Sequence, residues 1–523
     1  MSLVTAGAPG VFGRRAPAVR PAAGRFLAGK GGDRLQAALV GLGVLALSLL
    51  AGAAVLDPRS SDLVVPAIGL SILVGIAAVS RGALVGFTLL GVLNGIPGLD
   101  LDAFAVPGSF RPSDLLIAFL IGVLVLWHFT TAADQLVDSR WLALTRTWAF
   151  IFIAWWLVTL ARSVFFSDIP PLHAALFGRD FLYFALLLPL LPVALRRRSD
   201  IVTLVAVVGT AAAIFSVAQT TTSLFPSLAG VVDLSALINP TLTNELEGLT
   251  RIYSYMGDVV IVGAIVAAGT AILARSSRLR LGASALFVLL TVGALAQLSR
   301  ASYASMLAGL LVLVGIAMFR APAPLVVARK IVPALALLVA LFPLLGLVHP
   351  VEQNSQSAAQ VFATRAGSGI EEIQARSGTF GYRYNVQSEM LDVVGNRWPV
   401  GVGFWHPDDR FVSGLPEGSI RNGDVGVLNG ITTIGAVGTT LLFLPVLGTI
   451  LFLWRRRPTG SGEWDGFIFG ASGWLFGVAV ASISLVTLFS VQGLLLTAVV
   501  IVAAASVASL PPDPGGSRLR ART

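Results

Sequence analysis

Long apolar runs, each about as long as one bilayer crossing, alternate with short polar connections along most of this chain. The first run, Gln36–Leu56, would span about 30 Å as an α-helix, because a helix rises ~1.5 Å per residue. The uncharged stretch Phe467–Leu510 is too long for one crossing, so it is expected to divide near Ser490. The pattern predicts an all-α, polytopic transmembrane helix bundle of about 12–14 spans.

The other predicted spans are 13 to 29 residues long and share the lack of charge at their centres. They are Leu63–Val79, Gly82–Ile96, Asp114–His128, Trp148–Leu160, Phe181–Leu195, Ile201–Gln219, Asp258–Ala274, Leu281–Leu298, Ala301–Phe319, Ile331–Val348 and Gly426–Trp454. Transporters usually place ionisable groups near the bilayer midplane. Their absence from the middle of these runs argues against ion-coupled transport.

One long polar segment interrupts the apolar runs, and it defines the expected domain organisation. The expected division is a disordered basic cytoplasmic tail (1–35), an N-terminal bundle of about 11 spans (36–348), an extracytoplasmic loop (349–425), C-terminal spans (426–510) and a cytoplasmic tail (511–523). Loops held by a rigid scaffold can carry acids and cations that lipid-facing helices cannot. We therefore expect the chemistry of this protein in the long loop.

Composition and charge support this interpretation. Hydrophobic residues make up 55% of the 523 residues and charged residues only 12%, so a bilayer is the expected solvent for most of the chain. With both termini placed in the cytoplasm, two thirds of the 36 Lys and Arg residues fall on the cytoplasmic side. The net charge of +9 is thus explained by topology and contact with membrane lipid, with no nucleic acid required. The expected location is the cell (inner or plasma) membrane, with the long loop outside.

The inventory of metal ligands is small. The chain has no Cys and four His, which removes disulfides, zinc–thiolate sites and iron–sulfur clusters. We predict no cofactor and no metal site.

Several arginines stand at the outer ends of predicted spans, namely Arg162, Arg179, Arg251 and Arg300. One interpretation is structural: such side chains extend to the interface, or pair locally, as Arg179 could with Asp180. The other is a cluster that binds an anion, since the planar guanidinium donates two hydrogen bonds to a phosphate at once. Arg300 is the strongest candidate because it lies in a tight turn between two spans.

Within the long loop, Tyr382–Val394 has apolar residues at helical spacing, with Gly395 where a C-terminal cap is expected. The following sequence, NRWPVGVGFWHPDD, contains a Gly-rich turn between aromatic residues. GVG alone is a weak signal for a phosphate-binding loop, because no Walker lysine follows it. The aromatic rings could stack on sugars, but packing of the loop onto the bundle is the favoured interpretation.

Two residues are candidates for a general base. Asp424 lies where the loop re-enters the membrane, so it would face the outer arginines and could accept a proton from a hydroxyl group. His406 is the second candidate, although its HPDD context is typical of an exposed turn.

At these residues the sequence resembles the O-antigen ligase/polymerase family of membrane glycosyltransferases. Members show a turn like SRG between two spans, here Ser299–Ala301. A long outer loop follows, with an Arg-led helix, here from Arg383, and a P-x-G-x-G turn, here Pro399–Gly403. Re-entry ends in G-x-x-G, matched by Gly435 and Gly438, and counting back places Asp424 at the His/Asp position of the family. The resemblance covers roughly Leu281–Leu451.

The resemblance implies a GT-C-like scaffold that takes a polyprenyl-diphosphate-linked glycan as donor and a glycan hydroxyl as acceptor, without a metal. Arg300, Arg383, Arg251 and Arg179 would hold the diphosphate, and Asp424 would be the base. A chain-length regulator and a flippase would be further partners. Aspartate rather than histidine at position 424 favours a polymerase over a ligase. The alternatives are a lipid-linked oligosaccharide flippase or polysaccharide exporter, and a non-catalytic scaffold whose loop binds cell-wall polymer.

Overall fold

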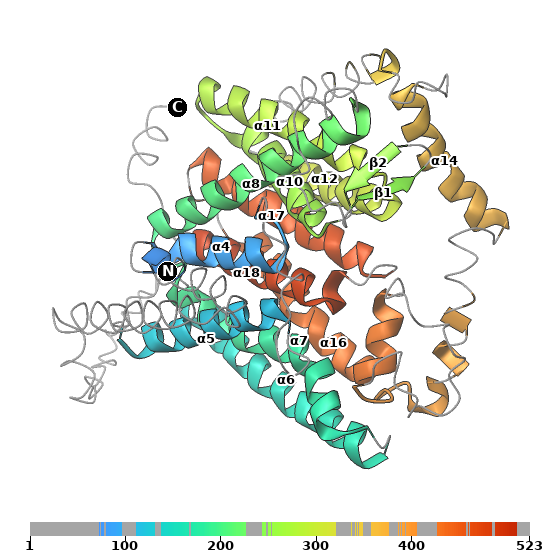
Figure 1. Ribbon diagram of the computed structural model, residues 1–523. Coiled ribbons are helices and arrows are strands. Elements are labelled where there is room, and N and C mark those ends of the chain that lie inside the picture. Colours follow the sequence, from blue (N-terminus) through green and yellow to red (C-terminus); the bar gives the residue numbers. More distant parts are fainter. Residues whose placement is uncertain are drawn as a thin grey trace, which may run out of the picture.

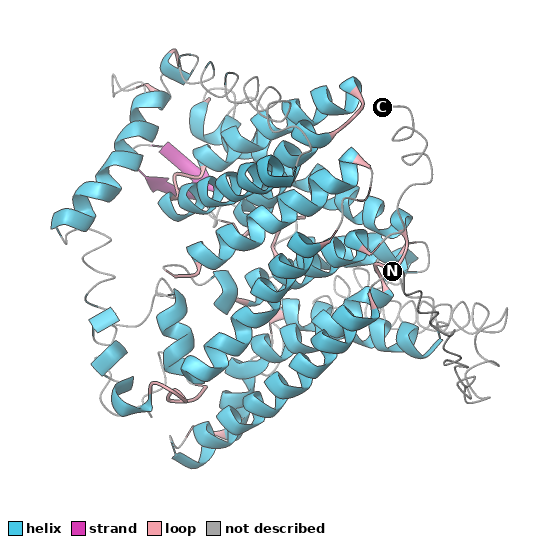
Figure 2. Ribbon diagram, turned by 180° about the vertical axis from the view of Figure 1, so that it is seen from behind, coloured by secondary structure: helices cyan, strands magenta, loops and turns pink. Residues whose placement is uncertain are grey.

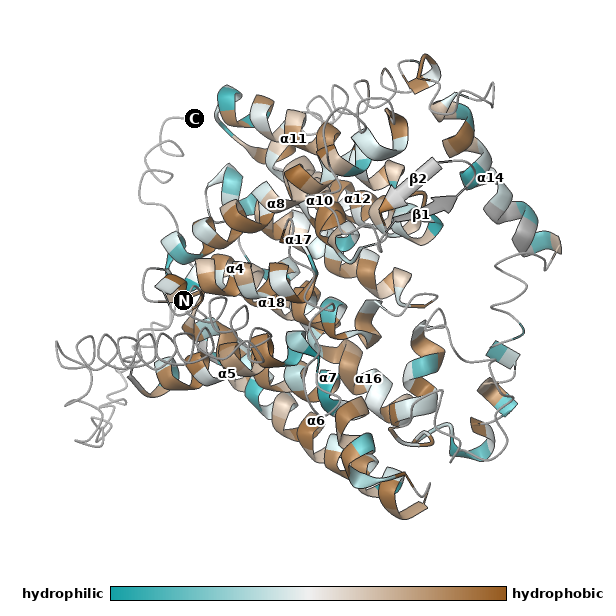
Figure 3. Ribbon diagram, viewed as in Figure 1, coloured by the Kyte–Doolittle hydropathy of each residue, from teal (hydrophilic) through white to brown (hydrophobic). Residues whose placement is uncertain are grey.

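Long apolar helices dominate the architecture. The computed structural model describes residues 80–96, 111–130, 138–166, 169–225, 254–320, 357–375, 394–404, 426–456, 461–483 and 487–509, two short strands, and isolated residues between these ranges. In this part of the chain, ten helices are long and apolar enough to cross a membrane. They pack side by side into one bundle (Figure 1), and hydrophobic residues predominate along them (Figure 3). The predicted all-α, polytopic transmembrane bundle is confirmed.

The described helices are α4 (Arg81–Val92), α5 (Pro112–Thr130), α6 (Ser139–Phe166), α7 (Pro171–Leu190), α8 (Arg198–Leu224), α10 (Met256–Leu273), α11 (Ser277–Ala296), α12 (Arg300–Arg320), α14 (Ala358–Ala375), α16 (Gly426–Arg455), α17 (Gly462–Ala481) and α18 (Val491–Ala508). Three 3-10 turns accompany them, at Leu191–Val193, Gly395–Arg397 and Thr487–Phe489. Every helix except α14 overlaps a predicted span, although α6 begins nine residues before and ends six residues after the predicted Trp148–Leu160. The predicted spans 36–56, 63–79 and 331–348 lie outside the described residues, apart from isolated positions.

The division between the last two helices lies at the predicted residue. Ser490 is extended and caps α18, because its hydroxyl accepts a hydrogen bond from the Gly493 N–H. The expected start of the sixth span at Phe181 is wrong, since α7 already begins at Pro171. A proline at the first helical position has no N–H to leave unsatisfied, which favours a start at this residue.

Small residues bring α10, α12 and α17 into close contact. A Cβ atom at Gly473 would lie 2.5 Å from the carbonyl oxygen of Gly309, and one at Gly477 would lie 2.4 Å from that of Ser305. On the other side, a Cβ atom at Gly466 would lie 2.7 Å from the backbone of Thr270. Helices in a bilayer associate through such close backbone approach, since lipid supplies no hydrophobic driving force between them.

Tryptophans of α6 fix this helix against α16. Pro445 has no N–H, so the carbonyl oxygen of Leu441 loses its helical partner. The indole N–H of Trp148 donates to that oxygen at 2.7 Å. In a membrane a free backbone carbonyl would cost several kcal/mol, and the tryptophan removes this cost.

Two further elements lie beside the bundle. Strands β1 (Thr243–Leu246) and β2 (Leu249–Ile252) form an antiparallel hairpin in which Leu246 pairs with Leu249. It is the single sheet in the described part of the chain, and Figure 2 shows it at one edge of the helices. Helix α14 lies outside the bundle on the same side as the hairpin (Figure 1).

Candidate functional site

The P-x-G-x-G turn is built into α16, which is broken at Gly435. Gly435 has φ 74° and ψ 170°, so the helix stops there and starts again. The break frees carbonyl oxygens before it and N–H groups after it. The turn takes up both sets through four backbone hydrogen bonds, Val402 N to Thr432 O (2.6 Å), Gly403 N to Thr433 O (3.1 Å), Ala436 N to Trp398 O (2.9 Å) and Val437 N to Pro399 O (3.1 Å).

The glycines of both motifs are required by this geometry. Gly401 and Gly403 have φ values of 74° and 119°, in the region that favours glycine. A Cβ atom at Gly435 would lie 2.4 Å from the carbonyl carbon of Val400, and one at Gly401 would lie 2.5 Å from the nitrogen of Gly435. The two motifs, more than thirty residues apart in the sequence, therefore form one structural unit.

Helix α6 holds this unit from the other side. The guanidinium of Arg162 donates to the carbonyl oxygens of Val400 (2.6 Å) and Gly401 (2.8 Å). The Ser163 hydroxyl accepts a hydrogen bond from the N–H of Phe404 at 2.6 Å. The indole N–H of Trp155 donates to the carbonyl oxygen of Ile434, directly before the break.

These contacts favour packing of the turn onto the bundle over a phosphate-binding loop. The N–H groups of Val402, Gly403 and Phe404 are all bonded within the protein, so this turn does not present them to a phosphate. Phe404 is fully buried against Trp156 and Phe181, which is the packing role expected for most of the aromatic residues. The Trp398 side chain differs, since it is 56% exposed.

Arg300, the first residue of α12, lies against α14. Its Nε donates to the carbonyl oxygen of Arg365 at 3.2 Å, and its Nη2 donates to the Ser368 hydroxyl at 2.9 Å. In return, Nε of Arg365 donates to the carbonyl oxygen of Leu298 at 3.3 Å. Leu298 has φ 55°, which turns the chain tightly between α11 and α12. Arg300 thus joins the turn between two spans to a helix of the long loop.

The hairpin that carries Arg251 is attached close to the same turn. Buried Gln219, in α8, accepts a hydrogen bond from the Ile252 N–H at 3.0 Å and donates to the carbonyl oxygen of Ala296 at 3.0 Å. Arg251 precedes Ile252 in β2, and Ala296 ends α11, four residues before Arg300. The structure therefore brings the backbones at Arg251 and Arg300 to the same end of the bundle; the Arg251 side chain lies outside the described atoms.

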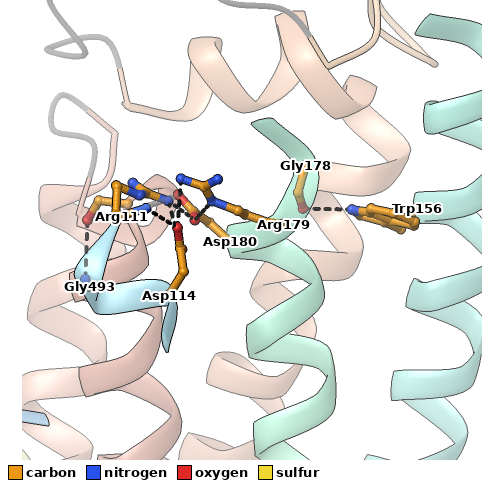
Figure 4. Close-up of polar contacts among 8 residues, drawn as sticks. Arg111, Asp114, Trp156, Gly178, Arg179, Asp180 and Gly493 are labelled. Atoms are coloured by element: carbon orange, nitrogen blue, oxygen red, sulfur yellow. Dashed lines mark hydrogen bonds and ion pairs between the residues drawn. The ribbon is translucent and has the colours of Figure 1, made fainter. Parts of the chain in front are cut away.

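Arg179 belongs to a separate cluster of four charged residues (Figure 4). Its Nη2 lies 3.0 Å from Oδ2 of Asp114, and Nη2 of Arg111 lies 2.5 Å from Oδ1 of Asp180. Burial acts to lower the pKa of Arg111, but the carboxylates of Asp180 and Asp114 outweigh it and raise the pKa. Two cations balance two anions, so the cluster ties α7 to the start of α5.

Three predicted site residues lie outside the described residues. They are Asp424, His406 and Arg383. The predicted helix that follows Arg383 is partly described: Met390 and Val394 are helical and buried, while Leu391 is exposed and so faces away from them. Gly395 has φ 45°, as its predicted position after the helix requires.

Sequence reasoning missed α14 and Arg365. A signal was present, since Ser357 and Gln360 have the spacing of a capping box. The structure shows this box: the Ser357 N–H donates to the Gln360 side chain at 2.7 Å, and the Gln360 N–H donates to the Ser357 hydroxyl at 3.3 Å. Ala358, Val361 and Phe362 then pack at helical spacing.

Comparison with known proteins gives one match. Residues 285–443 match the family model described as O-Antigen ligase. The matched range begins in α11 and ends in α16, so it contains the Arg300 turn, α14, the P-x-G-x-G turn and the break at Gly435. No curated protein matches the sequence.

Proposed function

We propose that this chain, whose residues 285–443 match the O-antigen ligase family model, transfers a glycan from a polyprenyl-diphosphate carrier to a sugar hydroxyl outside the cytoplasm. The family match and the ten apolar helices support a multi-pass membrane protein with a ligase or polymerase role in polysaccharide assembly. Such a role involves a lipid-linked glycan donor and a glycan acceptor. We infer further that the product is a polymer, because position 424 carries Asp rather than His.

The observation that carries this proposal is the place of Arg300. It lies at the end of a membrane-spanning helix, within the matched range, and it contacts a helix of the long loop. A lipid diphosphate must react at this level, since its polyprenyl tail stays in the bilayer while its head is outside. A guanidinium here would stabilise the negative charge that develops on the leaving diphosphate.

In the proposed reaction, the acceptor hydroxyl oxygen attacks the anomeric carbon of the donor. The bond from that carbon to the diphosphate oxygen breaks, the carrier diphosphate leaves, and the hydroxyl proton passes to the Asp424 carboxylate. Such a base is typically worth ~10²–10⁴ in rate. Arg383 and Arg251 are proposed to share the diphosphate with Arg300. Arg179 is a weaker member of this set, because its guanidinium is paired with Asp114.

Contacts between helix ends support the proposed topology. The distribution of Lys and Arg assigns each helix end to the outer or the inner side of the membrane. Each of the following contacts joins two helix ends that are assigned to the same side. The outer contacts are Arg111–Asp180, Arg162–Val400 and Arg300–Arg365, and the inner contacts are Arg81–Val193 and Asp138–Arg456. These contacts agree with the predicted sharing of sides. The proposal that the long loop is extracytoplasmic and the termini cytoplasmic, in the cell membrane, rests on the distribution of Lys and Arg.

Substitutions of Arg300 and Asp424 test the proposal. In cells that depend on this chain, Arg300→Ala, Asp424→Asn and Asp424→Ala should abolish long polymer and leave lipid-linked donor on the outer leaflet. Arg456→Met is a matched control, because it removes an arginine that pairs with Asp138 at the opposite end of the bundle. Donor held on the inner leaflet would instead indicate a flippase or exporter. Unchanged polymer in all three variants, at normal protein abundance, would overturn the enzyme assignment.

A further inference from the structure

We propose that Arg162 is a positioning residue that sets where the long loop re-enters the membrane, and so where Asp424 stands. The inference rests on the proposed function for its catalytic consequence. Its structural part, that Arg162 holds the P-x-G-x-G turn in place, can be tested without any assumption about the reaction.

The contacts of Arg162 are directed away from its own helix. Arg162 lies near the end of α6, where a cation would be expected to interact with the helix's own last carbonyl groups. Its two Nη atoms instead donate across to two successive carbonyl oxygens, those of Val400 and Gly401. A single planar guanidinium therefore fixes both the position and the orientation of this peptide segment.

The turn passes this constraint on to α16. Its four backbone hydrogen bonds to the two sides of the break at Gly435 replace those that a continuous helix would make. The half-helix before the break, residues 426–434, is therefore tied to the turn through the carbonyl oxygens of Thr432 and Thr433. That half-helix begins two residues after Asp424. A shift of the half-helix would therefore move the backbone to which the proposed base is attached.

Other residues of α6 also hold the turn and the broken helix, and their contacts show which part of the turn depends on Arg162 alone. Ser163 and the buried ring of Phe404 hold the end of the turn, and Trp155 holds the carbonyl before the break. None of these groups bonds to the carbonyl oxygens of Val400 or Gly401. Without Arg162 the middle of the turn would lose its attachment to α6, while both of its flanks would stay anchored.

Labelling of introduced cysteines measures the position of the turn directly, because the chain contains no cysteine. Val402 is 3% exposed, so Val402→Cys in detergent-solubilised protein should react slowly with a maleimide. Adding Arg162→Met should raise its labelling rate by about 10-fold or more, as an undocked segment becomes accessible. With Arg162→Lys, the labelling rate of Val402→Cys should lie between the rates measured with Arg162 and with Arg162→Met, since an ammonium group can still reach one carbonyl oxygen.

Two further cysteines distinguish release of the turn from general unfolding. Trp398→Cys replaces an exposed side chain and should label quickly with or without Arg162. Ala174→Cys, fully buried in α7, should stay protected in both cases. Labelling of Ala174→Cys in the Arg162→Met protein would mean that the bundle itself had loosened, and this would overturn the positioning role.

The functional readout is polymer per molecule of protein in cells. Arg162→Met should reduce it by about 10- to 100-fold, because a displacement of ~1 Å can cost that much in rate. Arg162→Lys should make an amount of polymer between those of the parent protein and Arg162→Met, just as its labelling rate lies between theirs. Arg456→Met should make as much polymer as the parent protein. A turn that stays protected in Arg162→Met, or one that is released without loss of polymer, would overturn the inference. If Arg300→Ala and Asp424→Asn both stay active, the proposed function fails, and the labelling result still reports on Arg162.

Discussion

Replacing Gly435 by alanine tests the junction between the turn and the broken helix. The backbone at φ 74° and ψ 170° is in a region that is essentially restricted to glycine, and a residue with a Cβ atom there costs on the order of 1–3 kcal/mol. The Cβ atom would also lie 2.5 Å from the carbonyl oxygen of Pro399, so the turn has to move away. Loss of the four backbone hydrogen bonds would add about 0.5–1.5 kcal/mol each. The junction would be destabilised by about 3–9 kcal/mol in total.

Gly448→Ala is a control in the same helix. Gly448 lies after the break, and a Cβ atom there would contact nothing within 4 Å. Alanine should therefore be neutral or stabilising at this position, by up to ~1 kcal/mol. The thermal midpoint of the solubilised protein, followed by tryptophan emission, should fall clearly for Gly435→Ala and not for Gly448→Ala. Polymer should be lost only in the first variant. Equal midpoints and equal polymer in the two variants would refute the described junction.

Three other substitutions probe the bundle. Trp148→Phe leaves the carbonyl oxygen of Leu441 without its donor, and we expect a loss of stability of about 1–3 kcal/mol, measured as a lower thermal midpoint. Gly473→Leu places a side chain where a Cβ atom alone would be 2.5 Å from the Gly309 carbonyl oxygen, so it should abolish folding, seen as loss of the monodisperse peak in gel filtration. Burial acts to raise the pKa of Asp138, but hydrogen bonds from backbone N–H groups and a guanidinium outweigh it and lower the pKa. The ionised Asp138 carboxylate therefore stabilises the folded protein fully at a pH above the ordinary carboxyl pKa, and this stabilisation is lost as the pH falls through the lowered pKa of Asp138. Acidification below about pH 4 should thus reduce the thermal midpoint more in the parent protein than in Asp138→Asn.

The sequence predicted the helices well because a bilayer imposes a simple rule. A span needs about twenty apolar residues whatever it packs against, so residues such as Ser490 could be placed without knowledge of their neighbours. The start of α7 was misjudged because Arg179 and Asp180 look like a membrane boundary in the sequence. In the structure Asp114 and Arg111 neutralise them, and the helix continues through both residues.

The site was less predictable because its contacts are long-range. The P-x-G-x-G turn and the G-x-x-G pair were both identified, but no local pattern shows that one supplies the hydrogen bonds that the other lacks. Arg162 was one of several arginines at span ends, and only the fold shows that it bonds to residues more than two hundred positions away. The hairpin could have been found locally, since two short strand-like segments are separated by only Glu247 and Gly248.

The way the break at Gly435 is satisfied also bears on the choice between a transferase and a transporter. Transporters leave the ends of their broken helices facing a cavity, where freed carbonyl and N–H groups bind ions or substrate. Here the carbonyl oxygens of Thr432, Thr433 and Ile434 are bonded by the turn and by Trp155, and the N–H groups of Ala436 and Val437 are bonded by the carbonyl oxygens of Trp398 and Pro399. These groups are therefore committed to holding the loop and are not presented to a passing ligand. A break used in this way fixes an extramembrane segment to the bundle, which a catalytic loop requires and a transport path does not.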